Sequence, residues 1–145
     1  MAKRRATIIE SLQSPTLLGG LPCFRDLSSW TRWLVFLRAV YGLPMSADEE
    51  RVYCYHTGRS RYAPPDGGFP EVAAIVGRQA GKDRIGSAIQ DHEAVTAESQ
   101  ADGTELYSLN IAQDSRSSLR TAFRYACAPF EVVPAFSKFV HQKRS

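Results

Sequence analysis

Long apolar runs are missing from this chain, and so are cysteine patterns that would mark a metal site or a disulfide framework. No stretch approaches the roughly 20 apolar residues that a membrane-spanning helix needs. The run behind the basic N-terminus, Thr7-Ile8-Ile9, is too short for a signal peptide core. The three cysteines, Cys23, Cys54 and Cys127, lie far apart, which favours a reducing compartment. We therefore expect a cytoplasmic protein that has no membrane partner.

The chain also has little net charge, no internal repeats and no low-complexity segment. Its hydrophobic content of 43% and charged content of 23% argue against disorder. The net charge of +3 is too small to indicate a nucleic-acid partner by itself. Basic residues gather in Lys3-Arg4-Arg5 and Lys143-Arg144, which we interpret as solvated termini. A length of 145 residues then indicates one domain.

Helix signals fill the first half of the chain. Residues 26–42 form the clearest predicted helix, with Ser28 or Ser29 as its N-cap and Gly42 at its end. Its apolar residues share one face, which predicts packing into a core rather than ligand stacking: Trp30, Trp33, Leu34, Leu37 and Tyr41. Ser46 and Glu49 form a capping box that predicts a second helix from Ala47 to about His56. A short helix around Ile8, Ile9 and Leu12 should end before Ser14-Pro15.

The stretch 71–87 has the layout of a phosphate-binding loop. Val72 to Val76 is an apolar run that predicts one buried strand, followed by a turn through residues 77–81. From Lys82 the apolar spacing becomes helical and predicts a helix to about Ala97. The first N–H groups of such a helix lack partners and form a positive end, and Gly81 would let the backbone approach an anion.

The match to the phosphate-loop pattern G-x-x-x-x-G-K-[ST] is imperfect. If Gly81-Lys82 are the G-K pair, Val76 takes the first glycine position and Gly77 comes one place late. Asp83 stands where the pattern has a hydroxyl. On these residues alone, an ordinary strand-to-helix turn remains open as an alternative.

The rest of the chain predicts one more strand and two more helices. Leu106 to Ala112 should be the strand, and a helix capped by Asp114 or Ser115 should be stopped by Pro129, with Leu119, Ala122, Phe123 and Ala126 on its inner face. Pro134 should open a last short helix. Asp91-His92-Glu93 cannot close on one metal ion, because consecutive helical side chains point about 100° apart. We interpret these three residues as a solvated face.

Several segments, in this order, resemble the N-terminal part of the large subunit of phage terminases, the ATP-driven motor that packages viral DNA. The segments are Trp30 to Leu37, Tyr41 to Met45, His56 to Arg59, Val76 to Lys82, and Ile111 to Arg116 with the helix through Arg124. The resemblance covers roughly residues 8–140. It implies an α/β fold, namely a partial P-loop NTPase with a βαβα unit of parallel strands.

The resemblance also implies roles for the loop residues. The family commonly carries an arginine after the first glycine of the loop, and Arg78 after Gly77 matches this. Lys82 would contact the β- and γ-phosphates of ATP, and Arg78 would meet charge on the γ-phosphate. The implied nucleotide-binding residues are Gly77, Arg78, Gln79, Ala80, Gly81, Lys82, Asp83 and Arg84, with Thr57 and Arg59 as candidates for contacts to adenine. Asp83 would be the Mg²⁺ ligand.

Two departures limit what the resemblance implies. Asp83 brings a negative charge close to a triphosphate, so we expect weaker nucleotide affinity or an altered metal geometry. No apolar strand ends in the acidic pair that holds Mg²⁺ and positions water in such ATPases, and the family's C-terminal nuclease has no counterpart. The two expected strands would have unpaired edges or would have to pair with each other.

We therefore expect an N-terminal helical segment over 1–70 and the first half of an ATPase core over 71–145. The protein would be an ATP-binding fragment of a terminase large subunit that does not hydrolyse ATP by itself. Implied partners are double-stranded viral DNA, the portal and the small terminase subunit, in the cytoplasm of a bacterial host. Oligomers are expected of the full-length protein but not of this fragment. The alternative is a non-enzymatic helical interaction module acting through the aromatic helix 28–41 and the basic tails, with a structural glycine turn.

Overall fold

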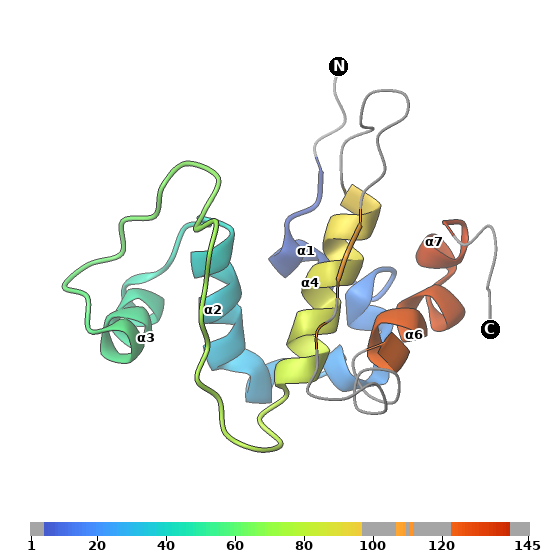
Figure 1. Ribbon diagram of the computed structural model, residues 1–145, viewed down its shortest axis with the longest axis horizontal. Coiled ribbons are helices and arrows are strands. Elements are labelled where there is room, and N and C mark those ends of the chain that lie inside the picture. Colours follow the sequence, from blue (N-terminus) through green and yellow to red (C-terminus); the bar gives the residue numbers. More distant parts are fainter. Residues whose placement is uncertain (1–4, 97–106, 110, 112–122, 140–145) are drawn as a thin grey trace. The chain divides into compact units, whose positions relative to one another are not determined.

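The computed structural model describes residues 5–96, 107–109, 111 and 123–139, and every regular element in these ranges is a helix (Figure 1). The predicted α/β fold is therefore wrong for the described residues. Residues 72–76 form no regular element, and Val72 and Ile75 are 49% and 107% exposed, so this segment is no buried strand. The described hydrophobic residues of the other expected strand are also exposed: Tyr107, Leu109 and Ile111.

The physical reason is the lack of a neighbouring strand. An extended segment becomes a strand only when another strand satisfies its N–H and C=O groups, and a lone pair of strands is marginal in water. The described ranges offer neither segment such a partner. Apolar residues at strand-like spacing then remain in solvent instead of building the core of a sheet.

The chain divides into two compact units, which we describe separately. Unit 1 comprises Met1–Arg25 and Gly77–Ser145, and unit 2 comprises Asp26–Val76. The N-terminal residues thus pack with the C-terminal half of the chain. No helix in the described part of either unit is long and apolar enough to cross a bilayer.

Unit 1 is built on helix α4 (Lys82–Thr96), which contacts α1 (Ile8–Gln13) and α6 (Arg124–Val132) (Figure 1). Helix α7 (Pro134–Ser137) packs on α6, and the short 3₁₀ helices η1 (Leu18–Gly20) and η2 (Pro22–Phe24) follow α1. Its buried apolar side chains are Ile8, Ile9, Leu12, Leu18, Leu21, Phe24, Ile85, Ala88, Val133 and Phe136. The predictions of α1, of α4 and of a helix opened by Pro134 are confirmed.

Pro129 does not stop the third predicted helix, which corrects that expectation. It lies inside α6, and its carbonyl accepts a 2.8 Å hydrogen bond from the N–H of Val133. Proline removes one helical hydrogen bond, but Pro129 is fully buried, so packing supports the helix through this position. The predicted start of this helix, at Asp114 or Ser115, lies outside the described residues.

Unit 2 is a helical hairpin of α2 (Thr31–Val40) and α3 (Ala47–Thr57), preceded by the 3₁₀ helix η3 (Ser28–Trp30). Its core contains Val35, Ala39 and Tyr53, with Met45, Val52, Cys54 and Tyr62 packed against them. Leu37 is the one fully buried member of the predicted aromatic face; the others are half-buried. Ser28 and Ser29 do not cap α2, which begins after η3 without a side-chain cap. The Ser46–Glu49 capping box is confirmed.

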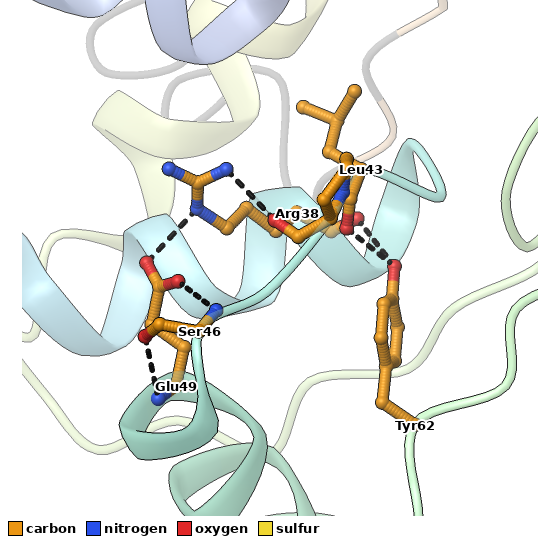
Figure 2. Close-up of polar contacts among 6 residues, drawn as sticks. Arg38, Leu43, Ser46, Glu49 and Tyr62 are labelled. Carbon is orange, nitrogen blue, oxygen red and sulfur yellow. Dashed lines mark hydrogen bonds and ion pairs between the residues drawn. The ribbon is translucent and has the colours of Figure 1, made fainter.

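Polar contacts hold the loop after α3 against this hairpin (Figure 2). The hydroxyl of Tyr62 lies 3.0 Å from the carbonyl oxygens of both Arg38 and Leu43. The N–H of Phe69 donates to the carbonyl of Val40 at 3.0 Å. These bonds satisfy carbonyls near the C-terminal end of α2, which a helix leaves without intrahelical partners.

Candidate functional site

The predicted loop forms a turn that leads directly into α4. Residues 78–81 make the turn, with positive φ angles of 59° at Gln79 and 84° at Gly81. Glycine adopts such angles freely, whereas they are uncommon for other residues. α4 begins at Lys82, as the sequence predicts. The turn-to-helix half of the phosphate-loop layout is therefore present, and the strand half is absent from the described structure.

The start of α4 leaves backbone donors near this turn. The N–H groups of Arg84 and Ile85 both donate to the carbonyl of Gly81 at 3.1 Å. The N–H groups of Lys82 and Asp83 precede these first helical bonds. Such donors and the helix dipole make this end of a 15-residue helix electropositive.

The loop side chains differ in what they can offer a ligand. Gly77, Arg78, Gln79, Ala80, Lys82 and Asp83 are exposed. Two cations therefore reach solvent beside the helix N-terminus, and the Asp83 carboxylate partly offsets them. The guanidinium of Arg84 instead stacks over the ring of Tyr125 on α6, 4.6 Å from its centroid. This contact stabilises the α4–α6 packing.

Thr57 and Arg59, the candidates for contacts to adenine, make contacts within unit 2. The Thr57 hydroxyl donates to the carbonyl of Tyr53 at 2.8 Å and accepts from the N–H of Arg59 at 3.3 Å. The Arg59 guanidinium lies over the ring of Phe69, 4.9 Å from its centroid. The Thr57 side chain thus contacts the backbone at the C-terminal end of α3, and the Arg59 side chain packs on the loop that follows. Both residues belong to unit 2, and the turn 78–81 belongs to unit 1.

Asp83 is the single residue expected to hold Mg²⁺, and it lies exposed in the first turn of α4. No group of three or more His, Cys, Asp or Glu side chains in the described ranges could hold a metal ion. Mg²⁺ commonly binds through one or two carboxylates, several waters and substrate phosphates. One exposed carboxylate is therefore what the described part of the loop offers a metal ion.

The interpretation of Asp91 and His92 as solvated is wrong, although Glu93 is exposed. Asp91 and His92 are only 2% and 5% exposed. Burial raises the pKa of Asp91 to about 8 and lowers the pKa of His92. The signal lay in the spacing, because Asp91 and His92 follow the buried Ala88 by three and four residues, and Ala88 itself follows the buried Ile85 by three.

Comparison of the chain with protein-family models, curated proteins and solved structures found no match.

Proposed function

We propose that residues 77–84 bind the phosphate groups of a nucleotide, with ATP as the expected ligand. The observation that carries the proposal is the turn at residues 78–81, which places exposed Arg78 and Lys82 at the N-terminus of α4. Backbone donors at a helix N-terminus favour an anion, and two nearby cations add to that attraction. Residues 76–82 also resemble the phosphate loop of terminases, and this resemblance supports the same ligand.

The loop residues would act in different ways on this ligand. Lys82 would contact the β- and γ-phosphates, and Arg78 would meet charge on the γ-phosphate. Asp83 would contribute one ligand to Mg²⁺ that is also held by phosphate oxygens and water. The site would bind and orient the nucleotide without an acidic pair to activate water, so binding rather than turnover is the proposed activity.

By the same resemblance, we propose that nucleotide binding belongs to a viral DNA-packaging motor. Double-stranded viral DNA, the portal and the small terminase subunit would be the partners. This wider role depends on the sequence resemblance alone. Nucleotide binding also has support from the geometry of the turn, and it can be tested without those partners.

The test is a titration of the chain with ATP in the presence and absence of Mg²⁺, followed by amide chemical shifts. The largest shifts are expected at residues 77–84, and the double variant Arg78→Ala with Lys82→Ala should abolish them. A double variant of Arg32→Ala and Lys138→Ala, which removes the same charge from exposed positions, is the matched control. The proposal would be contradicted if ATP caused no chemical-shift change at residues 77–84. It would also be contradicted if both double variants lost these changes equally.

Asp83→Ser tests the metal role separately. It restores a hydroxyl at the position where the general phosphate-loop pattern has one. We expect nucleotide affinity to rise with Mg²⁺ present, because the hydroxyl can bind the metal without adding negative charge. No gain in Mg²⁺-dependent affinity would contradict the role given to Asp83.

The second candidate function is a non-enzymatic helical interaction module. It is favoured by large hydrophobic side chains in solvent on unit 2, including Tyr55 at 85% exposure and Ile75 at 107%. In this case the glycine turn serves only to start α4. The chain would then give no shift at residues 77–84 with ATP, and the Arg78 and Lys82 double variant would keep its stability.

A further inference from the structure

Asp91 occupies an unusual position for a carboxylic acid. It lies in the middle of α4, 2% exposed, on the same side of the helix as the buried residues Ser87 and Ala88. An ionised carboxylate is costly to bury unless hydrogen bonds or opposite charges stabilise it. Burial is the one cause of the raised pKa of Asp91, and no hydrogen bond or charge from the described residues opposes it. The buried side chain is therefore suited to the neutral form.

Among the described residues, the charged and titratable groups on the helices that contact α4 do not lower the pKa of Asp91. On α1, Glu10 is exposed, and its carboxylate accepts from the N–H of Thr7. On α6, Arg124 and Glu131 are exposed, whereas Tyr125, which stacks with Arg84, and the Cys127 thiol are half-buried. On α4 itself the other such groups are Lys82, Asp83, Arg84, His92 and Glu93. No cation among these groups lowers the pKa of Asp91.

We propose that Asp91 is a pH-sensitive latch of unit 1, independent of the proposed nucleotide site. The protonated side chain lets α4 pack against α1 and α6, and loss of its proton to solvent loosens that packing. The latch depends on position, because Asp91 is buried whereas the same residue type at Asp83 is exposed.

The direction of the pH effect follows from proton linkage. The folded protein holds the Asp91 proton up to about pH 8, whereas the unfolded chain releases it near the ordinary value of 3.8. Unit 1 therefore loses stability as pH rises between these values. His92 has the opposite effect, since its lowered pKa makes unit 1 lose stability as pH falls below 6.5. Between about pH 6.5 and 8, the stability of unit 1 should therefore change with pH through Asp91 and not through His92.

The experiment compares the wild-type chain, Asp91→Asn and the exposed control Asp83→Asn. Hydrogen exchange of α4 amides at pH 6.5 and 8.5, corrected for the intrinsic exchange rate, reports opening of unit 1. Wild type and Asp83→Asn should open more at pH 8.5, on the order of tenfold, whereas Asp91→Asn should change little. An unchanged pH dependence in Asp91→Asn would overturn the proposal.

A second measurement needs no variant and decides the question if Asp91→Asn does not fold. The ¹³C shift of the Asp91 carboxyl in the wild-type chain should titrate well above pH 6. Titration near pH 4 would overturn the latch, because the ionised form would then be tolerated in the folded protein.

Discussion

The Nε atom of Arg38 donates a 2.9 Å hydrogen bond to Oε1 of Glu49, joining the last turn of α2 to the first turn of α3 (Figure 2). The second oxygen, Oε2, accepts from the N–H of Ser46 at 2.8 Å and completes the capping box. Both partners of the ion pair are about one quarter exposed. One carboxylate thus caps α3 and fixes the hairpin of unit 2.

Replacing Glu49 with alanine should lower the free energy of unfolding of unit 2 by about 1 to 2 kcal/mol, because it removes the cap and the ion pair together. Urea unfolding followed by tryptophan fluorescence reports this unit, since Trp30 and Trp33 both lie in it. Asp48→Ala is the control, because both side chains of its ion pair with Arg51 are about four-fifths exposed and the pair should contribute less than about 0.5 kcal/mol. Equal effects of the two variants would contradict the role of Glu49.

Glu49 also predicts an acid sensitivity of unit 2. Burial acts to raise its pKa, but the hydrogen bonds from Ser46 and the charge of Arg38 together lower it below the ordinary 4.5. The stabilisation is therefore present above about pH 4.5 and is lost as pH falls through the lowered pKa. In Glu49→Ala, the free energy of unfolding of unit 2 should therefore fall less steeply as the pH is lowered below about 4.5.

Gly68→Ala should destabilise unit 2 by about 3 kcal/mol or more. A methyl group at this residue would lie 2.0 Å from the carbonyl oxygen of Val40, and the φ angle of 92° is unfavourable for alanine. Gly67→Ala is the matched control, with a φ angle of 79° but nothing within 4 Å of the added methyl. It should cost about 1 to 2 kcal/mol from backbone strain alone. If the two variants unfolded at the same urea midpoint, the close approach of Gly68 to the carbonyl oxygen of Val40 would be refuted.

Two isoleucines test the correction of the predicted strand. Ile75→Ala should change the free energy of unfolding by less than about 0.5 kcal/mol, because Ile75 is fully exposed. Ile85→Ala should cost about 2 to 5 kcal/mol, because Ile85 is 2% exposed in the core of unit 1. Circular dichroism during urea unfolding measures both. A large decrease in the free energy of unfolding for Ile75→Ala would show that Ile75 is buried and would contradict this correction.

His92 predicts that unit 1 is weakened by mild acid. Burial lowers the pKa of its imidazole, although nearby Glu93 acts to raise it. The unfolded chain therefore binds a proton more readily below about pH 6.5, and stability falls with pH in that range. His92→Gln should remove this part of the pH dependence, whereas the exposed His56→Gln should not. Hydrogen exchange of α4 amides between pH 5 and 7 is the measurement.

Much of the helical structure could be predicted because its signals are local. The Ser46–Glu49 capping box and the start of α4 at Lys82 depend on residues a few positions apart. The turn of the candidate site was predictable for the same reason. Thr7 and Glu10 form a capping box of the same pattern at the start of α1.

What could not be predicted depends on contacts between distant residues. The sequence by itself determined where α3 and α4 begin and which segments have strand-like composition. It did not determine the start of α2, which neither Ser28 nor Ser29 caps. Only the tertiary structure decided that residues 72–76 stay in solvent, because a strand needs a neighbour and the described chain offers none. The spacing in α4 places Asp91 and His92 on the same face as Ile85 and Ala88, but only the tertiary structure shows that this face is buried, because α1 and α6 pack against α4.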